Sequence, residues 1–205
     1  MISVTIDAIL QIIFFTLFPF LVYIIKNKSV KGFLNYIGLI KPTKKSVFLA
    51  VLLSLLFAMP MLLLTWISED LKKIMFNPDS ITGNFRQMEF GIKAVYILIV
   101  IALFKTSFAE EILFRGFIAK RLINVFGFKK GNFLQAIVFG FIHAALFALI
   151  INNYVFLIII FIIPSIAAYF AVYLNEKFAN GSIIPGWISH GLANLLVYSI
   201  VGFIM

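Results

Sequence analysis

Apolar runs of about 20 residues recur along the whole chain, and this pattern limits the fold more than any other feature of the sequence. A helix rises about 1.5 Å per residue, so about 20 apolar residues cross the roughly 30 Å hydrocarbon core of a bilayer. The composition agrees, because 63% of the 205 residues are hydrophobic, only 12% are charged, and the mean hydropathy is +1.11. The sequence therefore predicts an all-α polytopic membrane helix bundle, with residues 1–205 forming a single integral membrane domain.

We expect about six transmembrane helices, at residues 3–25, 46–67, 91–121, 133–150, 154–174 and 183–205. Residues 1–90 hold the first two helices and their loops, whereas residues 91–205 hold the last four, which form the predicted catalytic core. The third helix would be about 46 Å long, more than a bilayer core requires. It must therefore tilt, extend into the cytoplasm, or break near residues 105–107.

The distribution of charge predicts how the chain crosses the membrane. The net charge is +9, and the loops at 26–45 and 120–132 are rich in Lys, whereas half of all the acids lie at 68–90. Basic loops stay in the cytoplasm, so both termini are expected outside, in a multi-pass protein of the cell membrane. Residues 33–42 form either a short amphipathic surface segment or a plain loop. Such basic residues contact anionic lipid and do not indicate nucleic-acid binding.

Charged residues occur in the third predicted helix, where they are costly and usually functional. Glu111 and Arg115 are four residues apart and can pair on one helix face, whereas Glu110 lies about 100° around the helix and is left to react. Two structural explanations remain open. All three residues could form a packing network, or Ser107 and Glu110 could form a capping box at the start of a helix.

Both histidines of the chain also fall within predicted membrane helices. Phe139 shares a helix face with His143, and His190 shares one with Asn194, because each pair is four residues apart. A single buried histidine is more often a packing residue. However, Glu110, His143 and His190 all lie about 12–17 Å from the cytoplasmic end of their helices. Small residues beside the histidines let helices approach closely, so we expect a polar pocket that opens toward the cytoplasm.

These residues could hydrolyse an amide in two ways. In the first, Glu110 is the general base that takes a proton from water, His143 shares that proton, and His190 and Asn194 donate hydrogen bonds to the oxyanion. In the second, Glu110, His143 and His190 bind a divalent metal, with Zn²⁺ as the candidate, and the metal activates the water. The chain has no H-E-x-x-H motif, and without cysteine it has no disulfide, thiolate ligand or cysteine nucleophile.

Three motifs in order carry a family resemblance. EEILFRG at 110–116, FGFIH at 139–143 and HGLAN at 190–194 resemble the EExxxR, FxxxH and HxxxN signature of the CAAX prenyl protease and bacteriocin-processing (Abi) family. The resemblance covers about residues 105–200. It implies an intramembrane endopeptidase in which Glu110 activates water beside His143, Glu111 and Arg115 form a structural pair, and His190 and Asn194 hold the oxyanion. Lys105, close to the first motif, departs from the pattern.

The resemblance implies cleavage of a membrane-associated protein or peptide within the lipid bilayer. The size of the chain is similar to that of bacterial members, which act in bacteriocin self-immunity, peptide maturation or signalling. Two other functions remain open. One is a non-catalytic membrane immunity or signalling scaffold protein, and the other is an ion- or proton-coupled carrier that uses the acids and histidines as a relay.

Overall fold

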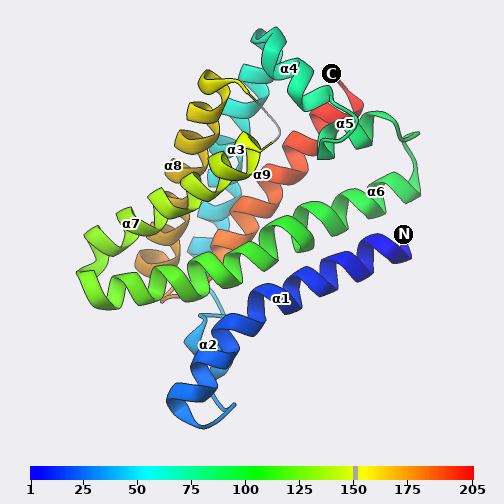
Figure 1. The fold of residues 1–205 in the computed structure, drawn as a ribbon. Helices are drawn as coiled ribbons and strands as arrows, with labels where there is room; N and C mark the ends of the chain where they lie inside the picture. The colour runs from blue at the N-terminus through cyan, green and yellow to red at the C-terminus, as the bar shows by residue number, and fades with distance from the viewer. Residues whose placement is uncertain (150–151) are drawn as a thin grey trace. The chain divides into compact units, whose positions relative to one another are not determined.

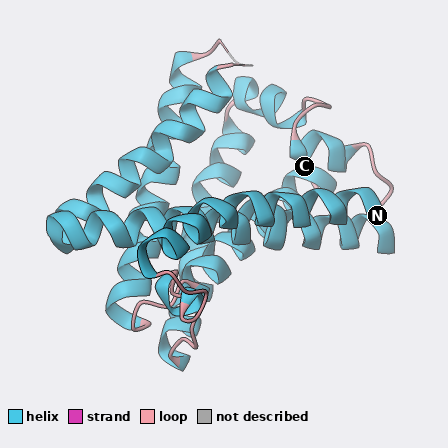
Figure 2. Cartoon of the chain, turned by 60° about the horizontal axis from the view of Figure 1, so that its bottom comes forward, coloured by secondary structure: helices cyan, strands magenta, loops and turns pink. Residues whose placement is uncertain are grey.

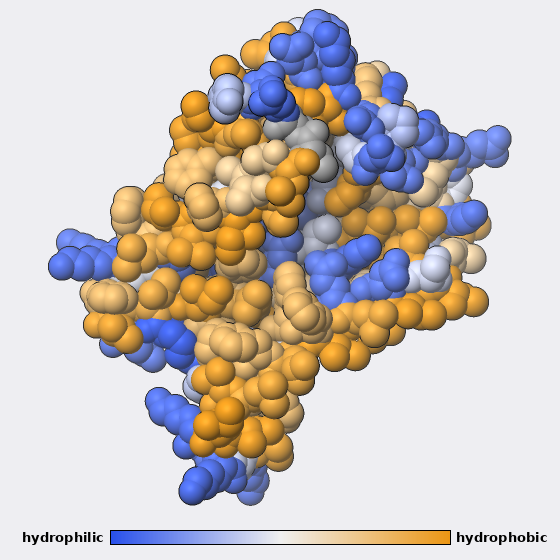
Figure 3. Space-filling model, viewed as in Figure 1, coloured by the Kyte–Doolittle hydropathy of each residue, from blue (hydrophilic) through white to orange (hydrophobic). Residues whose placement is uncertain are grey.

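The fold consists of helices and the turns that join them, in a computed structural model that describes residues 1–149 and 152–205. No strand occurs in these two described stretches, and Figure 2 accordingly shows helices joined by loops. The predicted all-α membrane fold is confirmed. The face drawn in Figure 3 is covered mainly by apolar residues, as expected of helices that contact lipid.

Five helical runs in the described residues are long and apolar enough to cross a membrane. Four are single helices, namely α1 (Ile2–Asn27), α3 (Lys44–Ile67), α8 (Tyr154–Phe178) and α9 (Ile184–Phe203) (Figure 1). The fifth run, Ile92–Ala148, joins across a kink at Gly127 the two helices that the sequence predicted at 91–121 and 133–150. The five runs thus agree with the predicted bundle of about six helices, because this run contains two arms. The end of the range 133–150 lies outside the described residues.

The long run reverses direction at Gly127, within α7 (Lys120–Ala148). Gly127 has φ 75° and ψ 165°, a conformation that glycine adopts without steric cost. After the reversal, a Cβ atom at Gly131 would lie only 2.5 Å from the backbone nitrogen of Ile123, so the two arms touch. The predicted loop at 120–132 is therefore wrong, because one glycine turns the chain while both arms stay helical. Figure 1 shows α7 doubling back.

The first arm of the run contains two π-helical segments. It begins with α6 (Ile92–Ile99), continues as η1 (Val100–Phe108) and η2 (Glu111–Ala119), and keeps helical backbone angles at the two residues between them. The helix is thus continuous past Lys105 and does not break there. Ser107 lies inside η1, and its hydroxyl donates to the carbonyl of Ala102 at 2.6 Å. The capping-box interpretation of Ser107 and Glu110 is therefore wrong.

Short helices occupy the two segments that follow α1 and α3. The basic segment contains α2 (Phe33–Tyr36), and the acidic segment contains α4 (Glu69–Phe76) and α5 (Ile81–Arg86). The helices α4 and α5 begin at serine caps, because the side chains of Ser68 and Ser80 accept backbone N–H groups. Local capping thus orders a segment that hydropathy alone shows only as a loop.

The chain folds into two units, and each combines segments that are distant in sequence. The first unit comprises Met1–Phe14, Val51–Ala109 and Trp187–Met205, and the second comprises Phe15–Ala50 and Glu110–Gly186. The first has cores around Val201 and around Phe85, and the second has a core around Phe139. The boundary between Ala109 and Glu110 therefore divides the predicted site residues between the units.

In the second unit, the segment after α2 is fastened to the turn between α8 and α9. Ile183 N donates to the Gly38 carbonyl at 2.9 Å, Ser182 Oγ donates to the Ile40 carbonyl at 2.6 Å, and Thr43 Oγ1 donates to the Phe178 carbonyl at 2.8 Å. At the same turn, Lys120 Nζ lies 2.7 Å from Glu176 Oε1 and donates to the Gly181 carbonyl at 2.8 Å. These hydrogen bonds order the segment at 33–42, for which the sequence predicted either a plain loop or a surface helix.

Candidate active site

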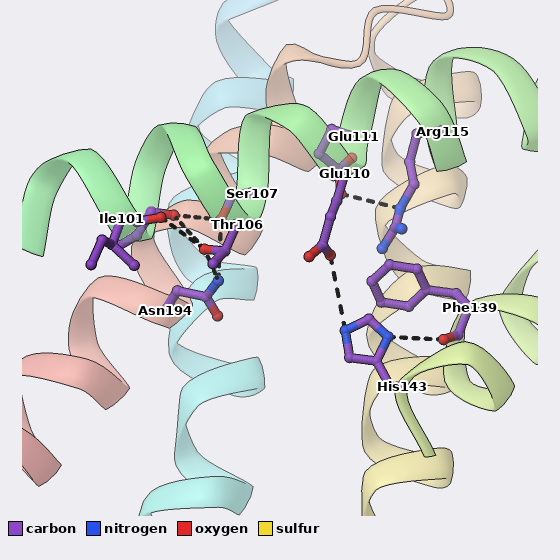
Figure 4. Close-up of polar contacts among 10 residues, drawn as sticks. Ile101, Thr106, Ser107, Glu110, Glu111, Arg115, Phe139, His143 and Asn194 are labelled. Carbon is purple, nitrogen blue, oxygen red and sulfur yellow. Dashed lines mark hydrogen bonds and ion pairs between the residues drawn. The ribbon is translucent and has the colours of Figure 1, made fainter. Parts of the chain in front are cut away.

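Glu110 and His143 meet within the second unit. Glu110 lies just before η2 and His143 lies in the second arm of α7, and Glu110 Oε2 is 3.9 Å from His143 Nε2. Both side chains are largely but not completely buried, with 17% and 26% of their surface exposed. Figure 4 shows the carboxylate pointing toward the imidazole ring. The structure thus brings together the base and the histidine that the sequence predicted as its neighbour.

The tautomer of His143 follows from its second contact. Nδ1 lies 2.9 Å from the carbonyl oxygen of Phe139, one turn earlier in α7. A carbonyl only accepts hydrogen bonds, so Nδ1 carries a hydrogen and donates it. In the neutral ring, Nε2 is then an acceptor that faces the Glu110 carboxylate. Two acceptors in this arrangement are suited to a proton donor, such as a water molecule, held between them.

Glu111 and Arg115 form the ion pair that their spacing predicts. Glu111 Oε1 lies 3.2 Å from Arg115 Nε, and the two side chains are 0% and 2% exposed. The guanidinium carbon of Arg115 stands 3.9 Å from the ring centre of Phe139, whose ring in turn lies 4.3 Å from that of His143. Phe139 therefore links the buried ion pair to the histidine through ring contacts and a backbone carbonyl.

Gly186 and Asn175 support the same ion pair and were missed by the sequence interpretation. The backbone N–H of Gly186 donates to Asn175 Oδ1 at 2.8 Å, and a Cβ atom on Gly186 would lie 2.6 Å from Glu111 Oε2. No side chain fits at this position without displacing the carboxylate. The available signals were weak, since Asn175 is a lone amide in an apolar helix and Gly186 follows a proline near a helix start.

Asn194 belongs to the first unit, where it contacts the π-helical segment η1. Its amide nitrogen donates to Thr106 Oγ1 at 3.1 Å and to Ser107 Oγ at 3.2 Å (Figure 4). The sequence predicted Asn194 as a donor to an oxyanion. Its N–H groups are directed at two hydroxyls that the sequence interpretation did not assign to the site, and the oxyanion role stays a prediction.

His190 lies in the same helix, on the face that contacts η1. Trp187 and Asn194, three residues before and four residues after it, both bind that segment. Trp187 Nε1 donates to the Leu103 carbonyl at 2.6 Å, and its ring lies 4.8 Å from that of Phe108. A Cβ atom on Gly191 would lie 2.9 Å from a methyl carbon of Leu103, so the helix packs closely here. His190 itself is half-buried.

Comparison with known families identifies the chain. The model of the family described as type II CAAX prenyl endopeptidase, Rce1-like, matches residues 92–196, just over half of the sequence. The chain belongs to this family. Searches among curated proteins and among solved structures each found no match. The matched region contains the residues of all three motifs, from Glu110 to Asn194.

Membership of the Rce1-like family, together with five apolar helices of sufficient length, identifies a multi-pass membrane protein of the CAAX-type protease class. A peptide substrate and a lipid bilayer agree with both findings. The resemblance read from the three motifs is confirmed at the level of the family. The bacterial origin that the chain length indicated stays a prediction.

The zinc alternative needs three protein ligands around one ion. Glu110 and His143 contact each other in the second unit, whereas His190 belongs to the first unit. In residues 1–149 and 152–205, no group of three or more His, Asp or Glu side chains is arranged to hold a metal ion. Binding of Zn²⁺ by Glu110, His143 and His190 stays a prediction.

Proposed function

We propose that this Rce1-like protein is an intramembrane endopeptidase that cleaves a peptide bond of a membrane-associated protein or peptide with water activated by Glu110. The observation that carries the proposal is the 3.9 Å approach of Glu110 Oε2 to His143 Nε2, with the opposite ring nitrogen held by the Phe139 carbonyl. This geometry supports Glu110 as a general base for amide hydrolysis, with His143 held in place beside it.

The reaction starts with a water molecule between the two acceptors. Water gives one proton to the Glu110 carboxylate while its oxygen adds to the carbonyl carbon of the substrate, and His143 Nε2 orients the water by accepting its other hydrogen. The C–N bond of the tetrahedral intermediate then breaks, and protonated Glu110 returns the proton to the leaving amine. The products are a carboxylic acid and an amine. His190 is assigned to the oxyanion, as the resemblance implies.

Glu111 and Arg115 serve this reaction as a structural pair. Because Arg115 neutralises Glu111 in a site with almost no exposed surface, Glu111 is not the base. The pair instead holds Phe139, and through it His143, in one place. Of the two adjacent acids, the structure thus supports Glu110 as the reacting one.

The proposed site opens toward the cytoplasm, with both chain termini outside the membrane. Support comes from the basic segments around α2 and around the α7 reversal, since basic residues stay on the cytoplasmic side. The chain has no native cysteine. We expect a membrane-impermeant maleimide to label Glu89→Cys but not Lys129→Cys in intact cells, because both positions are exposed but on opposite sides. The reverse labelling pattern would contradict this topology.

The test of the proposed function compares the N-termini of membrane proteins in cells that express the wild type or Glu110→Gln at equal levels. New N-termini that depend on Glu110 would establish proteolysis, name the substrate, and show whether a prenylated cysteine precedes the cleaved bond. The matched control is Glu89→Gln, which removes an exposed acid from a connecting segment. Identical N-termini in all three strains, with the host phenotype retained by Glu110→Gln, would instead support a non-catalytic immunity or signalling scaffold.

A further inference from the structure

The two units differ in charge, and the whole net charge of the protein belongs to the second unit. The first unit holds five Lys and Arg and five Asp and Glu, so its formal charge is zero. The second unit holds twelve Lys and Arg but only three Glu, so its formal charge is +9. Of these acids, Glu111 pairs with Arg115, Glu176 pairs with Lys120, and Glu110 belongs to the proposed active site. The other basic side chains of this unit thus have no further carboxylate of the unit to pair with.

Two of these lysines lie over aromatic rings where three elements of the second unit meet. Lys177 Nζ, in α8, lies 4.1 Å from the ring centre of Phe128, which follows the reversal of α7. Lys45 Nζ, in α3, lies 5.5 Å from the ring centre of Phe178, the last residue of α8. The ring of Tyr173 links the two, at 6.0 Å from Phe128 and 5.9 Å from Phe178. These five residues form one lysine–aromatic cluster, which joins the start of α3, the reversal of α7 and the end of α8.

The lysine–aromatic cluster is open to its surroundings. Lys45, Tyr173 and Lys177 are exposed, and the two phenylalanines are partly exposed. Among the residues that the structure describes, no carboxylate lies within 4.0 Å of the ammonium group of Lys45 or Lys177. An ammonium group has three N–H donors, and these stay available to an acceptor on the side away from the ring. The cluster therefore holds two positive charges in place without neutralising them.

The reversal of α7 adds exposed apolar side chains next to these cations. Val125 and Phe126, which precede Gly127, are 72% and 50% exposed, and Lys129 and Lys130 after it are exposed as well. At the left edge of Figure 3, where Figure 1 places the reversal of α7, hydrophilic residues likewise stand beside apolar ones. Exposed apolar residues beside lysines are typical of a segment at the membrane–water interface, because acyl chains cover the former and headgroups meet the latter.

We propose that the lysine–aromatic cluster and the reversal of α7 bind anionic phospholipid. The ammonium groups of Lys45 and Lys177 donate hydrogen bonds to headgroup phosphates, and the acyl chains cover Val125 and Phe126. Basic sites between membrane helices bind anionic headgroups in this way. A zwitterionic headgroup carries its own cation, which the excess positive charge of the second unit repels, so the site favours an anionic lipid. Such binding does not depend on peptide hydrolysis.

The first experiment compares ligands on the unaltered protein. The full-length chain in an uncharged detergent is titrated with dioctanoyl phosphatidylglycerol, and its unfolding temperature is measured, because a ligand that binds only the folded protein raises this temperature. We expect a smaller rise with phosphatidylcholine of the same chain length and no rise with inorganic phosphate, which has no acyl chain. Equal rises with the two lipids, or a rise with inorganic phosphate as large as that with phosphatidylglycerol, would overturn the proposal.

The second experiment changes the cluster. Each basic residue near an anionic lipid surface contributes about a fivefold increase in affinity, so Lys45→Gln/Lys177→Gln should bind phosphatidylglycerol about 25-fold more weakly than the wild type. The matched control is Lys26→Gln/Lys28→Gln, which removes the same charge from two exposed lysines of the same unit outside the cluster, and which should keep most of the affinity. Lys45→Arg/Lys177→Arg should bind as the wild type does, since arginine keeps both the charge and the contact with the ring.

Equal losses of affinity in the two glutamine variants would show that the lipid meets only a diffuse basic surface, and would overturn the site. Unchanged affinity in Lys45→Gln/Lys177→Gln would overturn it as well. All four lysines are exposed, so the variants should unfold at the temperature of the wild type when no lipid is added. For a variant of altered stability, native mass spectrometry counts the bound phosphatidylglycerol directly and gives the same comparison.

Discussion

The two units of the molecule hold their polar side chains in opposite ways. In the second unit, Glu111 and Arg115 form an almost completely buried ion pair, and the Arg115 guanidinium lies over the ring of Phe139. In the first unit, Asn194 is neutral and half-buried, and its partners are hydroxyls that donate to the helix backbone. A charge buried at this depth needs its partner, because an unpaired one costs several kcal/mol, whereas a neutral bond is worth about 1 kcal/mol. The second unit should therefore tolerate substitution less than the first.

Replacing Glu110 with Gln should have the largest effect. Glutamine keeps the shape of the side chain but cannot take a proton, so the rate of peptide hydrolysis should fall by about 10²- to 10⁴-fold. Protein abundance should stay the same as in the exposed control Glu89→Gln. The measurement is the initial rate of cleavage of a fluorescent peptide that carries the cleavage-site sequence found by the N-terminal comparison. A rate within a few-fold of the wild type would show that Glu110 is not the general base.

Replacing Arg115 with Met should destabilise the second unit strongly. Methionine keeps apolar contact with Phe139 but leaves Glu111 as an uncompensated buried charge, at a cost of about 3–5 kcal/mol. Thermal unfolding of the purified protein in detergent measures the change. The double variant Glu111→Gln/Arg115→Met removes both charges and should recover much of the loss. If it is no more stable than Arg115→Met alone, the ion pair is not the cause.

Replacing Gly186 with Ala tests how closely the ion pair is packed. The added Cβ atom would lie 2.6 Å from Glu111 Oε2, so the carboxylate or the backbone must move. Overpacking of this kind costs about 1–3 kcal/mol. Gly91→Ala is the control, because a Cβ atom there meets no atom within 4 Å. Equal thermal stability of the two variants would show that the space around Glu111 is not restricted.

Replacing Trp187 with Phe, in the first unit, should have the smallest effect on stability. Phenylalanine keeps the contact with Phe108 but loses the N–H that binds the Leu103 carbonyl. The loss should be about 0.5–1.5 kcal/mol of unfolding free energy, typical of one neutral hydrogen bond. A loss as large as that of Arg115→Met would show that the neutral contacts of η1 matter as much as the buried charges.

The contacts that could be predicted from the sequence lie within one helix. Spacing by four residues placed Glu111 beside Arg115 and Phe139 beside His143, because helix geometry determines such neighbours wherever the helix goes. Hydropathy likewise located the long helices, since it depends only on local composition. These predictions needed no knowledge of how the helices pack.

The remaining contacts depend on packing between distant segments. Asn194 and Thr106 are 88 residues apart, and Gly186 meets Glu111 across a comparable separation. The π-helical turns of η1 and the reversal at Gly127 also escaped prediction. A π-turn has no distinct hydrophobic period that the sequence could show. Gly127 lies in a stretch of low hydropathy that was interpreted as a loop, so its turn between two helical arms was not predicted. Contacts of this kind can be predicted only when it is known which distant segments pack together.

The hydrogen bonds between the segment after α2 and the turn before α9 have a consequence for biosynthesis. Thr43 binds the Phe178 carbonyl and the Ile40 carbonyl binds Ser182, so these partners are separated by 135 and 142 residues. At about 5–20 residues per second, a ribosome needs roughly ten seconds to make the missing partners. During that time the nascent segment lacks these hydrogen-bond partners. We expect it to be the part of the newborn chain that depends most on insertion factors and chaperones.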